Sequence, residues 1–263
     1  MQTSFSGPRS VVITGASSGI GEALALAYAE PGVALGLTGR DAARLESVAA
    51  RCRAKGALVE TGLVDAAHRA AMAAWLADFD AAHPVDLVVA NAGISAGTGL
   101  DGETEEQARR IFAVNLDGVL NTIYPAIDAM RRRGKGQVAL VASLAGFRGL
   151  PGAPAYCASK AAVRVLGESL RGELAGQGID VSVICPGFVR SRMTARNPFP
   201  MPFLMDADPA AALIKRRLAR NIGRISFPWP MVAAVWLLAA LPAGWVDRVA
   251  ARMPRKPAAA GSS

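Results

Sequence analysis

The fold is decided near the start of the chain by the stretch Val11-Val12-Ile13-Thr14-Gly15-Ala16-Ser17-Ser18-Gly19-Ile20-Gly21. Its β-branched residues predict a short strand, and the apolar pattern from Ile20 to Ala29 predicts a helix. Gly15 permits a tight turn, Gly19 lets the backbone approach a pyrophosphate, and Gly21 lets the helix pack closely on the sheet. Because the first N–H groups of a helix attract phosphate, the stretch predicts a dinucleotide site. The expected cofactor contacts are Gly15, Ser17, Ser18, Gly19, Ile20 and Gly21.

The rest of the chain alternates strand-like apolar runs with helical patterns. The expected strands are 9–15, 33–38, 58–63, 85–90, 137–142, 179–185 and 224–227. The run 85–90 is apolar almost throughout, which is typical of a central strand covered on both faces. We therefore expect an α/β fold, a single Rossmann-like doubly wound parallel sheet of about seven strands with helices on both faces. The catalytic domain would cover residues 1–227, an apolar helical extension 228–253 and a disordered tail 254–263.

The composition narrows the class of protein. The 263 residues are 52% hydrophobic and 19% charged, which suits one domain with a full core. The three cysteines, Cys52, Cys157 and Cys185, are widely spaced, so neither a disulfide framework nor a metal site is expected. The net charge of +8 comes from scattered basic residues, which predicts no nucleic-acid partner. Residues 1–10 lack an apolar run, so we expect no secretory signal and a cytoplasmic location.

A tyrosine and a lysine lie four residues apart in Tyr156-Cys157-Ala158-Ser159-Lys160. On a helix this spacing places both side chains on one face. An ammonium group beside a phenol favours the phenolate and lowers its pKa, so the pair predicts an acid/base. A lysine that merely extends over a packed tyrosine is the alternative.

Several short motifs follow one another in a fixed order along the chain. They are Thr14–Gly21 with the spacing T-G-x-x-x-G-x-G, then Asn91-Ala92-Gly93, Asn115, Ser143, Tyr156-x-x-x-Lys160 and Pro186-Gly187. In order and spacing these motifs resemble the short-chain dehydrogenase/reductase family over about residues 10 to 227.

The resemblance implies an oxidoreductase with the catalytic residues Asn115, Ser143, Tyr156 and Lys160. Ser143 would donate a hydrogen bond to the substrate carbonyl oxygen, and Tyr156 would exchange a proton with that oxygen. Lys160 would lower the pKa of the phenol and hold the nicotinamide ribose, while the nicotinamide carries the hydride without a metal. The backbone of Asn115 would help to hold a water linked to the lysine. Because asparagine is a poor former of helix interiors, a local irregularity is expected at Asn115, or else a merely tolerated polar residue.

The end of the second expected strand predicts which cofactor is preferred. Arg40 stands where an NAD-specific relative would carry an acidic residue, so NADP(H) is expected in preference to NAD(H), with a solvated surface arginine as the alternative. Asp41 is expected to cap the following helix. Asp65 would accept a hydrogen bond from the adenine, cap the helix that runs through Trp75, or do both.

The remaining contacts are implied by the resemblance. For the cofactor they are Asn91, Ala92, Gly93, Tyr156, Lys160, Pro186, Gly187, Val189 and Ser191. Asn91 would mainly tie neighbouring strands together, and Ser191 could equally be an ordinary loop serine. The loop 94–102 is expected to be mobile, and the segment 192–208, rich in Pro, Met and Phe, would form a substrate lid. For the substrate the expected contacts are Ser143, Leu144, Phe147, Leu150, Tyr156 and Phe188, which favour a small hydrophobic carbonyl compound or alcohol.

The C-terminal segment is unusual because residues 225–246 carry no charge and contain three tryptophans. Pro228, Pro230 and Pro242 interrupt it, leaving about eleven continuous helical residues, too few to span a bilayer. Three roles are open: peripheral contact with the inner face of the membrane, packing between subunits of a homo-dimer or homo-tetramer, or closure of the substrate pocket.

Taken together, these features favour an NADP(H)-preferring oxidoreductase that interconverts a ketone and a secondary alcohol on a lipid, steroid-like or acyl substrate. One alternative is a 3-oxoacyl-carrier-protein reductase, whose acidic partner would suit the basic chain. A non-catalytic nucleotide-binding or scaffold protein is an alternative of another class. It would bind cofactor without turnover.

Overall fold

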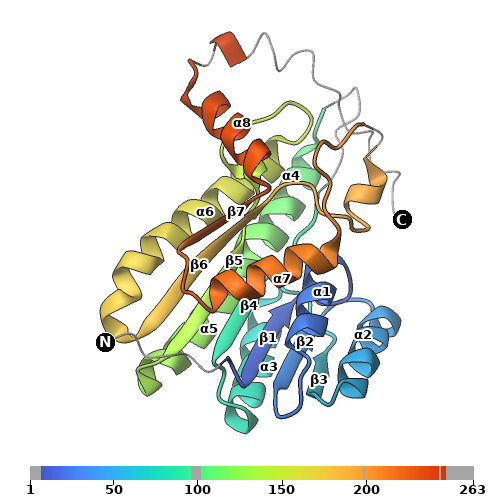
Figure 1. The fold of residues 1–263 in the computed structure, drawn as a ribbon, viewed down its shortest axis with the longest axis vertical. Helices are drawn as coiled ribbons and strands as arrows, with labels where there is room; N and C mark the ends of the chain where they lie inside the picture. Colours follow the sequence, from blue (N-terminus) through green and yellow to red (C-terminus); the bar gives the residue numbers. More distant parts are fainter. Residues whose placement is uncertain (1–6, 96–101, 198, 243, 247–263) are drawn as a thin grey trace.

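Seven parallel strands form one sheet in the computed structural model, which describes residues 7–95, 102–197, 199–242 and 244–246 (Figure 1). Their order across the sheet is β3-β2-β1-β4-β5-β6-β7. From β1 the chain adds strands toward one edge of the sheet, and from β4 it adds them toward the other edge. Ligands of such sheets bind at this switch point, beyond the carboxyl ends of the strands. The strands are β1 (Ser10–Thr14), β2 (Ala34–Thr38), β3 (Leu58–Gly62), β4 (Leu87–Ala90), β5 (Gly136–Val141), β6 (Ile179–Pro186) and β7 (Arg224–Phe227). The expected seven-stranded, doubly wound sheet is confirmed.

Helices cover both faces of this sheet (Figure 1). On one face lie α1 (Gly19–Tyr28), α2 (Ala42–Ala54) and α7 (Ala207–Leu218), and on the other lie α3 (Arg69–Ala82), α5 (Gly118–Arg133) and α6 (Pro154–Leu174). Successive side chains of a strand point to opposite faces. Val11 and Ile13 of β1 accordingly pack with α1, whereas Val12 between them packs with the helices of the second face.

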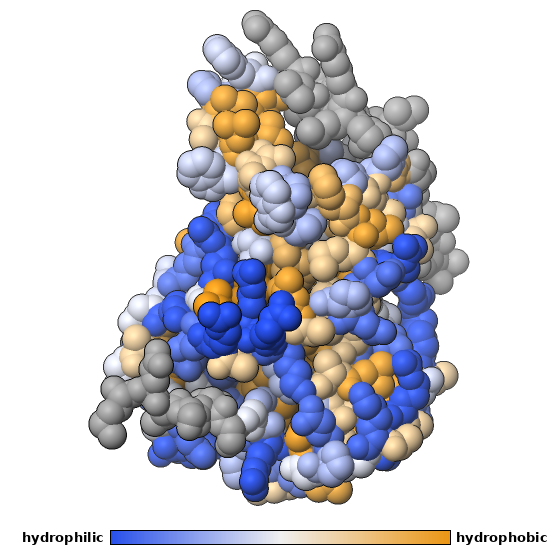
Figure 2. Space-filling model, in the orientation of Figure 1, coloured by the Kyte–Doolittle hydropathy of each residue, from blue (hydrophilic) through white to orange (hydrophobic). Residues whose placement is uncertain are grey.

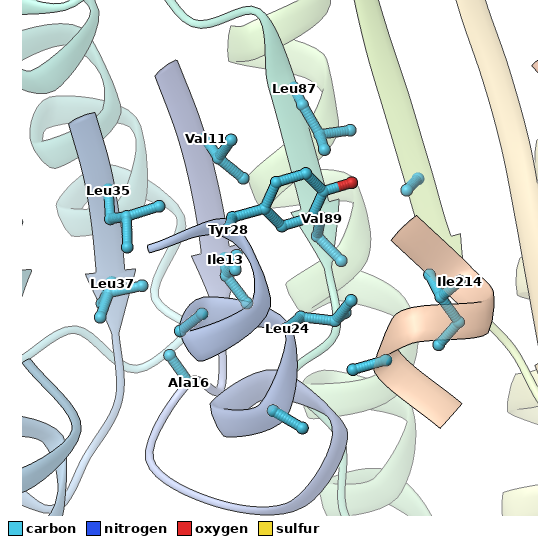
Figure 3. Close-up of a cluster of buried hydrophobic side chains, with 14 of the residues drawn as sticks. Val11, Ile13, Ala16, Leu24, Tyr28, Leu35, Leu37, Leu87, Val89 and Ile214 are labelled. Carbon is cyan, nitrogen blue, oxygen red and sulfur yellow. The ribbon is translucent and has the colours of Figure 1, made fainter. Parts of the chain in front are cut away.

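The core beneath α1 shows how the sequence pattern sets the packing (Figure 3). Leu24 and Tyr28 lie one turn apart on the buried side of α1, over the apolar side chains of β1 and β4. Ile214 of α7 joins the same cluster. Burial of apolar surface stabilises a fold by about 25 cal/mol per Å², so these layers hold the glycine turn before α1 firmly in place.

Asn115 lies in a local irregularity, as expected. The α-helix α4 (Glu105–Phe112) passes into a wider π turn at Ala113–Asp117 before α5 begins. Such turns are rare and are frequent at functional sites.

The structure confirms the cap expected at Asp41 and excludes the cap that was one of the alternatives for Asp65. Asp41 caps α2 as expected, because its side chain accepts a hydrogen bond from the Arg44 N–H at 3.0 Å. The cap of α3 is His68, whose Nδ1 accepts from the Ala71 N–H at 3.2 Å. Asp65 lies one turn earlier, where its carboxylate accepts from the Ala67 N–H at 3.0 Å and forms a turn of its own.

After β7 the chain forms the extra apolar helix α8 (Trp229–Ala240), which packs on β7 and on the short helix Leu144–Gly146. Within the described ranges no helix is long and apolar enough to cross a membrane. The expected tail 254–263 and most of the expected mobile loop 94–102 lie outside the described residues. The division into a domain at 1–227 and an extension at 228–253 stays a prediction.

Candidate active site

One large cavity of about 920 Å³ lies along the carboxyl ends of the strands. It reaches from the end of β2, past the glycine turn and the end of β5, to the side of α8. Its walls include almost every candidate site residue named from the sequence, the exceptions being Gly21, Asn115 and Phe147. Gly21 lies directly behind the turn, where a Cβ would overlap the Gly15 carbonyl oxygen.

The glycine turn has the geometry that a pyrophosphate needs. Gly15 and Gly19 have φ angles of +65° and +60°, which glycine adopts readily and other residues rarely do. A Cβ on Gly15 would lie 2.8 Å from the Ala92 Cα, and one on Gly19 would lie 2.9 Å from the Ser191 Cβ. Among the described residues no side chain caps the start of α1, so its first N–H groups remain for a ligand. The residues present therefore fit a dinucleotide.

Asn91 ties two strands together beside this turn, as expected. Its side-chain Nδ2 donates to the carbonyl oxygens of Thr14 at 2.9 Å and Gly15 at 3.2 Å. In return the Thr14 hydroxyl accepts from the N–H groups of Asn91 and Ala92, both at 3.1 Å. These bonds hold the ends of β1 and β4 at the point where the cavity crosses the sheet.

Arginines dominate the far end of the cavity, beyond β2. Arg40 is half exposed there, 3.7 Å from the Asp65 carboxylate. Arg44 also lines the cavity and pairs with Asp41 at 2.9 Å. Its Nε is buried without a hydrogen-bond partner among the described residues. Both nearby carboxylates are thus engaged by the protein. Arg44 was not predicted, although its place on the first turn of the helix after Arg40 could have indicated it.

Ser143, Tyr156 and Lys160 meet in the middle of the cavity. Ser143 follows β5, and its hydroxyl donates to the Pro186 carbonyl oxygen at 3.5 Å and hydrogen-bonds with the Tyr156 phenol. Tyr156 and Lys160 lie on α6, with the lysine Nζ 5.9 Å from the centre of the phenol ring. That Nζ donates to the Val141 carbonyl oxygen at 2.8 Å. The expected convergence of the three side chains is therefore present.

The electrostatics of this group differ from the prediction. Burial raises the pKa of Tyr156 above its ordinary value, and the hydrogen bond from Ser143 only partly opposes this. Burial also lowers the pKa of Lys160 to about 8. In the protein alone, then, desolvation outweighs any effect of the ammonium on the phenol, because both groups are removed from water. The pKa of Tyr156 is thus raised in this state, and the role expected of Lys160 in lowering it stays a prediction.

Asn115 contributes through its side chain. Its Oδ1 accepts from the Ile94 N–H at 2.7 Å, while its Nδ2 donates to the Ile94 carbonyl at 3.0 Å and to the Ser159 hydroxyl at 3.1 Å. A Cβ on Gly93 would lie 3.3 Å from both Asn115 Oδ1 and Lys160 Nζ. The π turn therefore fixes the strand end after β4 against the catalytic helix.

The segment after β6 supplies the opposite wall. Pro186, Gly187, Phe188 and Val189 line the cavity, and Ser191 lies against the glycine turn. The expected lid segment contributes Arg192, Met193, Thr194, Asn197, Phe199, Pro200 and Pro202. The rings of Phe188 and Phe199 pack edge to face, with centres 6.2 Å apart. This end of the cavity is mainly apolar.

Phe147 does not lie where the sequence predicted. It is absent from the cavity wall, and its ring packs beneath two guanidinium groups, with Arg164 at 4.7 Å and Arg224 at 5.6 Å from the ring centre. Leu144 and Leu150 do line the cavity. The short helix after Ser143 turns the Phe147 side chain away from the cavity. The ring instead stabilises this turn through its contacts with the two arginines.

Two further contributions come from α8, for which closure of the pocket was one of three open roles, and from Glu103, which was not predicted. Met231, Val235 and Leu238 of α8 close the apolar end of the cavity. Glu103, which precedes α4, accepts a hydrogen bond from the Ala155 N–H at 2.9 Å in the first turn of α6. Because α6 has no side-chain cap of its own, this carboxylate serves as one from 52 residues away. No sequence spacing could indicate so distant a partner.

The Glu103 cap can be tested by stability. Glu103→Ala is expected to lower the free energy of unfolding by about 1 kcal/mol, the usual effect of a lost helix cap, and the Tm by ~2–4 °C. Thermal unfolding of Glu105→Ala is the matched control, since both partners of the Glu105–Arg109 pair are more than three-quarters exposed. Equal losses in the two variants would contradict the role of Glu103.

Known proteins resemble this chain over most of its length. The model of the short chain dehydrogenase family matches residues 9–199. The chain belongs to the short-chain dehydrogenase family. It is an NAD(P)-dependent oxidoreductase. A relative from Myxococcus xanthus, an uncharacterized oxidoreductase, is 39% identical over 246 residues, which are 93% of this chain and 97% of the relative. An uncharacterized oxidoreductase of Mycobacterium tuberculosis is 35% identical over 238 residues, 87% of this chain and 93% of that protein.

Solved structures agree with this membership. A short-chain dehydrogenase from Sphingobium yanoikuyae in complex with NADPH has a TM-score of 0.78 and 28% identity, over 95% of this chain and 98% of the other. A 3-ketoacyl-ACP reductase from Sinorhizobium meliloti has a TM-score of 0.76 and 28% identity, over 86% and 99% of the two chains. A nicotinamide dinucleotide is therefore the cofactor of this dehydrogenase.

Proposed function

We propose that this dehydrogenase interconverts a ketone and a secondary alcohol on a hydrophobic substrate and prefers NADP(H). One observation carries the proposal: a single cavity joins the Ser143, Tyr156 and Lys160 side chains to a mainly apolar end. A polar reaction centre beside apolar walls suits a carbonyl group on a lipid, steroid-like or acyl body.

The proposed roles follow from the side chains. Ser143 donates a hydrogen bond to the substrate oxygen and orients it. In the reduction Tyr156 gives its phenolic proton to that oxygen, and in the oxidation it accepts the proton back. Bound in the cavity, the nicotinamide supplies or accepts the hydride at the carbonyl carbon. The raised pKa of Tyr156 keeps the proton on the phenol at neutral pH, which suits the reductive direction.

Lys160 and Asn115 position this centre. The buried Lys160 Nζ lies 5.9 Å from the centre of the Tyr156 ring, and we propose that it donates hydrogen bonds to the ribose of the bound cofactor. The Asn115 side chain holds Ile94 through two hydrogen bonds and reaches the Ser159 hydroxyl on α6 through a third. Proposed cofactor contacts are Gly15, Ser17, Ser18, Gly19, Ile20, Asn91, Ala92, Gly93, Pro186, Gly187, Val189 and Ser191, all of which line the cavity.

The preference for NADP(H) is supported by the pair of arginines beyond β2. Arg40 and Arg44 face the end of the cavity where a 2′-phosphate would lie, and the neighbouring carboxylates, Asp41 and Asp65, are already engaged. A bidentate guanidinium is well suited to a phosphate. Asp65 remains a candidate for the adenine as well.

Arg40→Asp should weaken NADPH binding roughly tenfold or more relative to NADH, because it places a negative charge opposite the 2′-phosphate. Fluorescence titration with both cofactors measures the two dissociation constants. Arg110→Asp makes the same charge change on exposed α4, away from the cavity wall, and should leave the ratio unchanged. Equal weakening of NADPH and NADH by Arg40→Asp would refute the assignment.

A second candidate, reduction of a 3-oxoacyl group on a carrier protein, is favoured by two basic residues. Arg148 and Arg192 line the cavity, and neither makes an ion pair with an acidic side chain in the described part of the chain. Together with the net charge of +8 they would attract an acidic partner or an anionic thioester. The structurally similar protein from Sinorhizobium meliloti is a 3-ketoacyl-ACP reductase.

Turnover separates these candidates. NADPH oxidation is followed with lipophilic ketones and with an acetoacetyl thioester, at equal concentrations. A higher kcat/KM for the ketones supports the first proposal, and a higher value for the thioester supports the second. Cofactor binding without turnover of either substrate class would favour a non-catalytic protein.

We also propose a homo-dimer or homo-tetramer, supported by the exposed apolar side chains Tyr124 and Val165 on α5 and α6.

A further inference from the structure

The helix α8 has two apolar faces. Its inner face carries Met231, Val235 and Leu238, spaced by four and three residues, and this face lines the cavity. A helix on the surface of a protein normally carries polar side chains on its other side. In α8 no residue is fully buried, yet no side chain from Trp229 to Ala240 is charged.

The outer face of α8 is strongly exposed. Trp229 is 78% exposed, Trp236 65% and Leu237 59%, with Ala233 and Ala240 on the same side. Trp245, shortly after the helix, is 67% exposed. We call Trp229, Trp236, Leu237 and Trp245 the outer patch. In Figure 2 hydrophobic residues gather at the end of the molecule where Figure 1 places α8. Large contiguous apolar surface of this kind marks an interaction site.

We propose that the outer patch docks on an anionic lipid surface, with α8 lying in the plane of the interface. The helix is twelve residues long and no described helix can cross a membrane, so an in-plane position is the one open to it. Tryptophan suits that position, because its ring is apolar while its indole N–H reaches the polar boundary.

The charge that follows this patch in the sequence favours a lipid surface over a second copy of the chain. Downstream of Asp247 the sequence contains only basic charges: Arg248, Arg252, Arg255 and Lys256. A two-fold contact would set the same patch against itself, and would bring two such basic segments together. An anionic bilayer instead attracts them, each lysine or arginine near the surface adding to the affinity.

The two faces of α8 then have one consequence. A single helix separates the apolar end of the cavity from the lipid, so an apolar substrate dissolved in the bilayer would enter beside Met231, Val235 and Leu238 without passing through water. The docking itself depends on exposure and charge alone. It therefore stands or falls separately from the proposed reaction, and its test needs no turnover.

Vesicle binding tests the proposal. The full chain is sedimented with vesicles of phosphatidylcholine, alone or mixed with phosphatidylserine. Binding is expected to the mixed vesicles, to weaken as salt is raised, and to fall roughly tenfold or more in Trp236→Ser/Leu237→Ser. The matched control is Leu58→Ser/Leu63→Ser, which removes leucines of 61% and 65% exposure near β3, far from α8 in Figure 1, and should bind as the unaltered protein does.

Tryptophan fluorescence provides a second measurement, whose expected result cannot be produced by loss of folding. Lipids with brominated chains quench an indole that touches them. The three exposed tryptophans of the outer patch should be quenched, whereas Trp75, stacked on Phe79 with ring centres 5.6 Å apart, should not. The triple variant Trp229→Phe/Trp236→Phe/Trp245→Phe keeps only Trp75. Its emission therefore identifies which part of the fluorescence of the unaltered protein comes from Trp75.

Three results would overturn the proposal. One is the absence of binding to mixed vesicles. Another is an equal loss of binding in Trp236→Ser/Leu237→Ser and in the control Leu58→Ser/Leu63→Ser. The third is an oligomer, detected by sedimentation velocity without lipid, that Trp236→Ser/Leu237→Ser alone dissociates. That outcome would assign the outer patch to a second copy of the chain.

Discussion

Replacing Tyr156 by Phe is expected to lower kcat by at least about a hundredfold, while the dissociation constant for NADPH stays within roughly twofold. The phenol is buried in the middle of the cavity and hydrogen-bonds with Ser143, so it is the proposed proton donor to the substrate oxygen. Phenylalanine keeps the ring and its packing and removes only the hydroxyl. The loss should therefore appear in kcat and leave the fold intact.

Steady-state NADPH oxidation with the best ketone measures this effect, and fluorescence titration measures cofactor binding. Tyr124→Phe is the matched control, because it removes the same hydroxyl from a side chain that is 43% exposed on α5. Its kcat should not change. Full activity of Tyr156→Phe would contradict the proposed acid/base role.

Lys160→Met is expected to lower kcat by a similar factor and also to change how stability depends on pH. The amine is buried at 4% exposure, and burial lowers its pKa to about 8 from the ordinary value of 10.5. Between these two pH values the unfolded chain keeps a proton that the folded chain has lost. The free energy of unfolding of the unaltered protein therefore rises with pH in this window.

Below about pH 8 both states are charged, and the folded state bears the full cost of burying the charge. Methionine has a similar length and no charge, so Lys160→Met lacks this contribution. Relative to the variant, the unaltered protein should gain on the order of 3 kcal/mol as the pH rises from about 8 to 10.5, since one pKa unit corresponds to about 1.36 kcal/mol.

Denaturant unfolding at a series of pH values measures this difference. Lys135→Met, at an exposed lysine after α5, is the control and should show no such window. The pH series runs from 7 to 11, ~two units on either side of the centre of the window. If the free energies of unfolding of Lys160→Met and the unaltered protein differ by a constant amount over this range, the buried, weakly basic amine is contradicted.

The parts of the molecule that local sequence determines were predicted well. The glycine turn and the irregularity expected at Asn115 follow from residue types whose backbone preferences are strong. Gly15 and Gly19 need positive φ, and asparagine interrupts a helix. In the same way Asp41 caps the helix that begins directly after it. Such signals act within a few residues, so they can be read without knowing the packing.

The errors arose where one turn of backbone decides where a side chain points. Phe147 was placed at the substrate because it is apolar and close to Ser143, but the short helix after Ser143 turns it toward Arg164 and Arg224. Asp65 was a plausible cap for α3, and the helix begins one turn later, at His68. Neither outcome follows from residue type alone.

Other features depend on contacts between distant parts of the chain. The carboxylate of Glu103 reaches the start of α6, and α8 returns to close the cavity that the sheet opens. The pKa values of Tyr156 and Lys160 depend on their burial, which the spacing of the two residues could not reveal. The sequence left three roles open for α8, and the structure supports closure of the pocket by its inner face.

The most direct test of the account is to follow the hydride. NADPH that carries deuterium at the transferable position of the nicotinamide is incubated with the enzyme and a lipophilic ketone, and the alcohol is analysed by mass spectrometry. We predict an alcohol with one deuterium at the former carbonyl carbon, formed by the unaltered protein and by Tyr124→Phe but strongly reduced in Tyr156→Phe. Bound cofactor with no labelled alcohol from any ketone or acyl thioester would contradict the central claim that this cavity transfers a hydride to a carbonyl group.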